Sequence, residues 1–82
     1  MTYDKDRVRK WLMSGKQKRS THVIVVYNRN ERDFRPMYIG HNQNVRSRIQ
    51  TINADYSTQP VEVYNLSMDI DNQLLQARTW NT

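Results

Sequence analysis

Residues 25–48, with the sequence VVYNRNERDFRPMYIGHNQNVRSR, decide the fold of this chain. The segment opens inside a run of four β-branched residues, 23–26. Such a run without alternation predicts a strand that is covered on both faces and central in its sheet. Polar residues 28–35 predict a hairpin loop, and Pro36 forces an extended approach to a second strand at 37–39. Because proline cannot donate to a ladder, we expect that strand to begin after Pro36 and to lie at an edge.

A helix is predicted after Gly40. Asn42 or Asn44 is a suitable N-cap for it. The apolar residues that follow recur at i, i+4 and i+7, which predicts one buried stripe ending near residue 53: Val45, Ile49 and Ile52.

The N-terminal flank predicts a short amphipathic helix over residues 4–13. Asp4 is its N-cap, Trp11 anchors its apolar stripe on the domain, and Gly15 is a natural stop signal. Residues 16–20 lack periodicity and are typical of a charged linker.

The C-terminal flank predicts a loop at 54–60, a third strand at 61–66 and a final helix. Asp69 or Asp71 opens that helix. Trp80 closes the helix, and its apolar residues fall in line at i, i+4 and i+7: Ile70, Leu74 and Ala77.

The predicted order is therefore helix, strand, strand, helix, strand, helix (αββαβα). Placing the first strand in the middle lets the third run antiparallel to it. The fold class is α/β (α+β), with a three-stranded antiparallel or mixed sheet in the order 2-1-3 flanked by helices. Periodicity points these residues into the core: Trp11, Val23, Val25, Ile39, Val45, Ile49, Ile52, Val63 and Leu74.

A chain of 82 residues makes one small domain. We divide it into a basic N-terminal helix and arm, residues 1–20, and the domain proper, residues 21–82. The absence of cysteine excludes disulfides and thiolate zinc sites, and two histidines are too few for a typical histidine metal site. No run approaches the roughly eighteen apolar residues of a membrane span, so we expect no membrane partner and a cytoplasmic location in a bacterial host.

The positive charge is concentrated in the N-terminal quarter. Residues 1–20 hold seven Lys and Arg against two Asp, whereas residues 21–82 hold six charges of each sign. Such a segment suits contact with a polyanion through counterion release, or is a solvated, solubilising segment. The candidate nucleic-acid-binding cations are Lys5, Arg9, Lys10, Lys16, Lys18 and Arg19.

Two tyrosines and an arginine are spaced in a way that points to a known family. Tyr27 and Tyr38 stand eleven residues apart, Gly40 closes the triplet 38–40, and Asn44 and Arg48 follow that glycine by four and eight residues. This pattern resembles the GIY-YIG nucleases, in which strands ending in Gly-Ile-Tyr and Tyr-Ile-Gly precede a helix that carries an arginine. The first motif here reads 25–27 Val-Val-Tyr, so its glycine is absent.

The resemblance implies phosphodiester hydrolysis with Mg²⁺ or Mn²⁺. It gives Tyr27 and Tyr38 the roles of the tyrosines that line the site and position or deprotonate water, and Arg48 the role of the phosphate contact. The planar, permanently charged fork of arginine suits phosphate oxygens. Gly40, His41 and Asn44 would touch the nucleic acid. The alternatives are half-buried strand tyrosines, a solvated Arg48 and a polar turn residue at His41.

The metal-binding glutamate of the family is missing. It commonly lies three residues before a bulky residue in the last helix, and Ala77 stands three before Trp80. The metal ligands are therefore unknown, and Mg²⁺ or Mn²⁺ is expected only if the protein is active. A relative that has lost cleavage, an enzyme with relocated metal binding and a deliberately replaced glutamate are all compatible with the sequence.

Two functions follow as expectations. The first is a GIY-YIG-like endonuclease, active or inactivated at Ala77, that contacts DNA with low sequence specificity and relies on a homodimer or partner protein for recognition. The second is a non-catalytic accessory protein of a phage or mobile element. Such a protein would bind nucleic acid, a nucleotide or a host defence protein.

Overall fold

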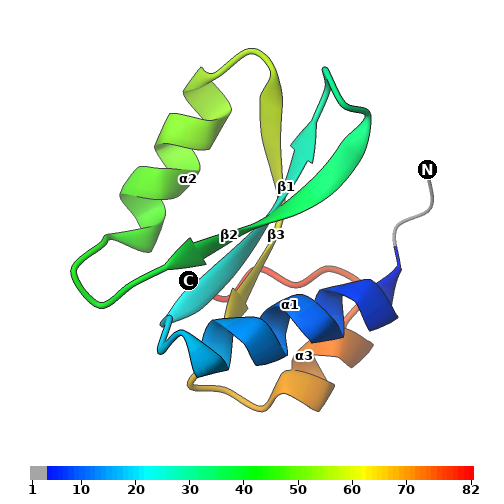
Figure 1. Cartoon of the computed structure of the whole chain (residues 1–82), viewed down its shortest axis with the longest axis vertical. Helices are drawn as coiled ribbons and strands as arrows, with labels where there is room; N and C mark the ends of the chain where they lie inside the picture. Colours follow the sequence, from blue (N-terminus) through cyan, green and yellow to red (C-terminus); the bar gives the residue numbers. More distant parts are fainter. Residues whose placement is uncertain (1–3) are drawn as a thin grey trace.

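The computed structural model describes residues 4–82 and forms a three-stranded sheet with helices on both faces (Figure 1). β1 is central and pairs antiparallel with both neighbours, giving the order β2-β1-β3. The predicted α+β class, element order and central first strand are confirmed. No helix within residues 4–82 has the length and apolar composition needed to cross a membrane. The elements are α1 (Lys5–Gln17), β1 (His22–Asn28), β2 (Asp33–Ile39), α2 (Val45–Ala54), β3 (Thr58–Asn65) and α3 (Ile70–Leu75).

The two faces of the sheet carry separate apolar clusters. Alternate residues of a strand point to opposite faces, so β1 contributes to both. Helices α1 and α3 cover the first cluster, and α2 covers the second (Figure 1). Every predicted core position lies in one of these clusters or packs against it. The first is built from Val8, Leu12, Val23, Val25, Tyr64, Leu66 and Leu74. The second is built from Ile24, Val26, Ile39, Ile52 and Val63.

α1 continues past its predicted end. Asp4 caps it as expected by accepting a hydrogen bond from the Asp6 N–H, but the helix runs through Gly15 to Gln17. Gly15 is buried, and a Cβ there would lie 2.9 Å from Leu66 Cδ1 and 3.0 Å from a Val23 methyl. The glycine therefore allows close helix–sheet contact and is not a stop signal. The charged linker shrinks to a tight turn in which Arg19 has a φ of 59°.

α2 begins where the sequence predicts. The Asn44 side chain accepts hydrogen bonds from the N–H groups of Arg46 and Ser47, and the helix ends at Ala54, one residue beyond the expected limit. Its apolar stripe faces the second cluster, with Ile52 buried and Val45 half-buried against it.

Both prolines lie inside strands, where the sequence prediction did not place them. Pro36 pairs with Val25 in the edge strand β2, where the missing N–H is tolerated. Pro60 lies beside a bulge in β3, because Val26 faces Pro60 whereas Val25 faces Glu62. The strand starts predicted at 37 and 61 are therefore wrong, and β2 and β3 begin at residues 33 and 58. The flanking loops are shorter than predicted.

The final helix is also shorter than predicted. Asp69 caps it, and it ends at Leu75 because Gln76 already has extended backbone angles. Ala77 consequently lies outside the helix and is exposed. The prediction that the helix continues through Ala77 and is closed by Trp80 is therefore wrong.

The C-terminal segment instead runs beside β3. Val63 donates its N–H to the Thr79 carbonyl at 2.9 Å and accepts from the Asn81 N–H at 2.9 Å, which forms a parallel bridge centred on Trp80. Buried Gln73 binds this segment through two hydrogen bonds. Its side-chain oxygen accepts one from the Asn81 amide, and its backbone carbonyl accepts one from the Thr79 hydroxyl. The outer edge of β3 is therefore covered at Val63.

Candidate nucleic-acid interface

Tyr27 and Tyr38 share a face of the sheet but lie far apart along it. In the ladder Tyr27 faces Phe34, and Tyr38 faces Val23. The tyrosines are thus offset by four residues, about 13 Å at the usual strand rise. The Tyr27 ring packs on Phe34 with centroids 5.1 Å apart, and Tyr38 packs against the first cluster. Both are half-buried strand residues, and the ladder does not bring them to a common site.

Arg48 lies on the opposite side of the sheet. It belongs to α2, which covers the second cluster, whereas Tyr38 packs against the first. The sheet therefore separates Arg48 from Tyr38. Arg48 is half-buried, and its Nε atom is buried with no hydrogen-bond partner among the described residues.

The turn into α2 gathers the other residues that the resemblance singled out. The Gly40 N–H donates to Gln43 Oε1 at 2.9 Å, and Asn44 is occupied as the helix cap. His41 is exposed and lines a hollow of about 480 Å³ together with His22 and Arg46. This turn lies at the end of the sheet where β1 begins, because the Thr21 N–H donates to the Ile39 carbonyl.

The first cations of α1 bind the domain. Lys5 donates to the Tyr64 hydroxyl at 3.0 Å and to Glu62 at 3.4 Å, and Arg9 pairs with Asp71. Burial alone would lower the pKa of Lys5, but the hydrogen bonds and charges of Tyr64 and Glu62 outweigh it and raise that pKa. Lys5 and Arg9, both predicted to contact nucleic acid, thus have acidic partners within the protein.

Arg7 ties the same helix to β2. It donates to both carboxylate oxygens of Asp33, at 2.9 and 3.3 Å, and to the Phe34 carbonyl. The hydrogen bonds from Arg7 and from the Phe34 N–H lower the pKa of Asp33. Because α1 also buries Val8 and Leu12 in the first cluster, this helix packs on the sheet through its apolar stripe.

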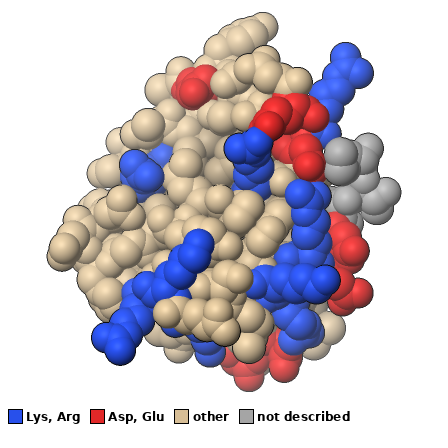
Figure 2. Space-filling view, in the orientation of Figure 1, with Lys and Arg blue, Asp and Glu red and all other residues tan. Residues whose placement is uncertain are grey.

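The remaining N-terminal cations are exposed. Lys10, Lys16, Lys18 and Arg19 form no ion pair with the described residues, and the Lys18 Nζ lies 4.0 Å from the centre of the Tyr38 ring. Figure 2 shows Lys and Arg side chains gathered over the lower half of the molecule, where α1 runs, with acidic side chains beside some of them.

Lys16, Lys18 and Arg19 precede Thr21 by at most five residues, and Thr21 is bonded to Ile39 just before the turn into α2. α1 ends and α2 begins at the same end of the sheet (Figure 1). A second hollow, of about 320 Å³, starts at Ser20 and shares Thr21, His22 and His41 with the first. We call this region the basic end and define it by its exposed cations, Lys16, Lys18, Arg19 and Arg46.

Two observations on the described residues bear on the metal that a GIY-YIG nuclease would use. Residues 4–82 contain no group of three or more His, Asp and Glu side chains placed to hold an ion. Ala77 lines a hollow with Glu62, but that carboxylate is buried and already accepts from the Lys5 amine, the Tyr64 hydroxyl and the Thr79 N–H. If Glu62 turned to bind a metal ion, these three donors would lose their acceptor.

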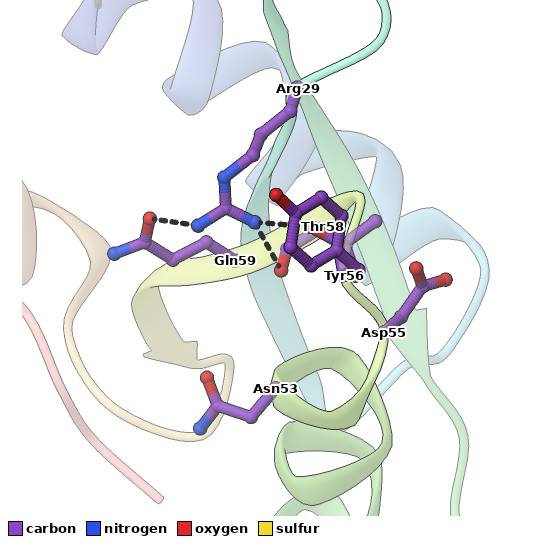
Figure 3. Close-up of a pocket in the computed structure, with 6 residues that line it drawn as sticks. All are labelled: Arg29, Asn53, Asp55, Tyr56, Thr58 and Gln59. Atoms are coloured by element: carbon purple, nitrogen blue, oxygen red, sulfur yellow. Dashed lines mark hydrogen bonds between the residues drawn. The ribbon is translucent and has the colours of Figure 1, made fainter.

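Sequence reasoning missed a pair of hollows on one side of α2. Trp80 lines one of about 380 Å³ with Arg46, and Tyr56 lines the other, of about 500 Å³, with Arg29 (Figure 3). A tyrosine inside the polar stretch 54–59 was the available signal for the second hollow. No comparable signal existed for the first, because it depends on where the C-terminal segment runs.

Comparison of the chain with models of protein families, with curated proteins and with solved structures found no match in any of the three.

Proposed function

We propose that this protein binds nucleic acid through the phosphate backbone and does not cleave it. The observation that carries the proposal is the grouping of exposed cations without acidic partners at the basic end. Lysine and arginine side chains that neutralise phosphates release condensed counterions, and this release drives sequence-independent binding. Half-buried His22 and exposed His41 line both hollows and add hydrogen-bonding groups to this surface.

Cleavage has less support than binding. The nuclease expected from the GIY-YIG resemblance needs Tyr27, Tyr38 and Arg48 around one phosphate. The β1–β2 register keeps the tyrosines about 13 Å apart, and the sheet stands between Tyr38 and α2. We therefore expect no nicking of plasmid DNA in Mg²⁺ or Mn²⁺.

A charge-matched pair of triple variants tests the binding surface. Lys16→Ala/Lys18→Gln/Arg19→Asn removes three charges from the basic end, and Lys10→Ala/Arg32→Asn/Arg78→Ala removes three exposed charges elsewhere. Asparagine is used at positions 19 and 32 because both have positive φ, which asparagine tolerates. Affinity for a fluorescent oligonucleotide is measured by anisotropy across a salt series.

The basic-end triple should lower affinity roughly tenfold or more at low salt and reduce the slope of log K against log salt by about 3, one for each lost phosphate contact. The control triple should change the slope by less than about 1. Equal effects of both triples would refute the basic end as the binding surface. A wild-type protein that binds neither DNA nor RNA would refute the function itself.

A further inference from the structure

Two exposed aromatic rings lie on one side of α2. Tyr56 is 94% exposed and Trp80 is 41% exposed, although burying such rings is strongly favourable. Each ring lines one of the hollows described above, so neither ring is isolated on a flat surface. Residues of this kind, left in water beside polar groups, are typical of surfaces that stack on a planar ligand.

One flank of α2 connects the two hollows. Arg46, Gln50 and Asn53 fall at i, i+4 and i+7, so they line the same side of the helix. Arg46 and Gln50 belong to the hollow of Trp80, and Asn53 belongs to the hollow of Tyr56. Side-chain amides along this flank present donors and acceptors that match the edges of nucleobases. We call Arg46, Gln50, Asn53, Tyr56 and Trp80 together the α2 groove.

Hydrogen bonds hold the backbone that carries each ring. Arg29 donates to the Tyr56 carbonyl at 2.7 Å and to the Thr58 carbonyl and the Gln59 side chain, as Figure 3 shows, and its N–H donates to the Ser57 carbonyl. These bonds pin the loop that presents Tyr56. The bridge to Val63 pins Trp80 in the same way. Backbone that is already ordered before binding loses less entropy when the ligand arrives.

The distance between the two rings matches the length of a few stacked nucleotides. Trp80 is level with Val63 in β3, and the hollow of Tyr56 includes Gln59, four residues earlier in the same strand. That offset corresponds to about 13 Å, which is roughly four stacked nucleotides at about 3.4 Å each. Arg46 also lines the hollow at the basic end, so the groove continues the proposed phosphate-binding surface.

From this arrangement we infer that the α2 groove binds single-stranded nucleic acid, with bases stacked on Tyr56 and Trp80 and phosphates near Arg46. The inference rests on the proposed function and adds the strand state of the ligand to it. Duplex bases are already stacked within the helix and cannot lie on these rings, whereas every unpaired base offers a free face. The groove therefore selects single strands, and the basic end alone does not.

The test compares oligonucleotides of about ten nucleotides, within the span that small single-strand-binding domains cover. Oligo-dT, oligo-rU and a DNA duplex of equal length are titrated by anisotropy. Tyr56→Ala and Trp80→Ala should each weaken binding of the single strands about five- to hundredfold and leave duplex binding unchanged. Trp80→Tyr should restore most of the affinity. Leu75→Ala is the control, because Leu75 is 83% exposed on α3, at the other face of the sheet.

Fluorescence supplies a second measurement. In a Trp11→Phe background, Trp80 is the remaining tryptophan, and stacking of a base on it should quench its emission as oligo-dT or oligo-rU is added. The ratio between the two ligands shows whether DNA or RNA binds better.

The outcomes separate the two proposals. If the aromatic variants match Leu75→Ala and no quenching occurs, while the basic-end triple still weakens binding, then the groove is refuted and the proposed function stands. If no oligonucleotide binds the wild-type protein, the proposed function is refuted. A single-strand preference that disappears in Tyr56→Ala and Trp80→Ala supports the inference.

Discussion

Gly15 and Gly40 are the two glycines of the chain, and their surroundings are opposite. A Cβ at Gly15 would meet Leu66 and Val23 at 2.9 and 3.0 Å, whereas one at Gly40 would meet only Gln43 Oε1, at 3.8 Å. Gly15→Ala should therefore destabilise the protein by about 1–2 kcal/mol, since overpacking outweighs the better helix propensity of alanine. Gly40→Ala should stay within about 0.5 kcal/mol.

Thermal melts check both glycine variants. About 1 kcal/mol corresponds to a shift of roughly 4–8 °C in Tm for a domain of this size. A Gly15→Ala protein that melts at or above the wild-type temperature would show that α1 can move away from the sheet without loss. The glycine of the Tyr-Ile-Gly triplet is expected to be the less constrained of the two.

At the scale of elements, one ion pair connects the first helix to the edge strand. The hydrogen bonds from Arg7 and the Phe34 N–H lower the pKa of Asp33 below its ordinary value. Its contribution to stability is therefore fully present above the unfolded pKa, near 3.9, and is lost as the pH falls through the lower folded pKa. Asp33→Asn should reduce Tm at pH 6, and the two melting temperatures should converge as the pH falls below the ordinary pKa of aspartate. Parallel Tm curves between pH 6 and 2.5 would contradict this assignment.

The elements could be predicted where local pattern and packing agree. The β-branched run at 23–26 and the stripe of Val45, Ile49 and Ile52 both appear as predicted. Failures occur where packing overrides a local signal. Gly15 looks like a helix stop but serves a close contact, and Pro36 and Pro60 look like strand breakers but lie at an edge and beside a bulge. Neither circumstance is visible before the neighbouring elements are placed.

At the scale of the whole molecule, the spacing of the candidate site residues in the sequence did not determine whether the fold brings them together. A separation of eleven positions between Tyr27 and Tyr38 is compatible with several hairpin registers, and the register observed offsets the two rings. Which face α2 covers was equally undetermined. The charge imbalance of the N-terminal quarter was readable from the sequence, but the division between Lys5 or Arg9, which pair internally, and Lys16 or Arg19, which do not, required the fold.

A glutamate introduced at Ala77 tests the resemblance at this scale. Ala77 is exposed and lies outside α3, so Ala77→Glu should stay folded, with a change in unfolding free energy of less than about 0.5 kcal/mol. It should gain no Mg²⁺- or Mn²⁺-dependent nicking of plasmid DNA, because Tyr27, Tyr38 and Arg48 do not surround a common point. Nicking that appears in Ala77→Glu and is abolished by Arg48→Ala would restore the nuclease interpretation.

The bridge between Val63 and Trp80 also bears on self-association. A three-stranded sheet normally offers two open edges on which further strands can assemble, which is a common route to aggregates. Here residues 79–81 already occupy the hydrogen-bonding groups of Val63 at one edge. The other edge is interrupted near its middle by Pro36, which has no N–H to offer. Copies of this chain that meet at high concentration are therefore expected to associate through side chains and not by extending the sheet.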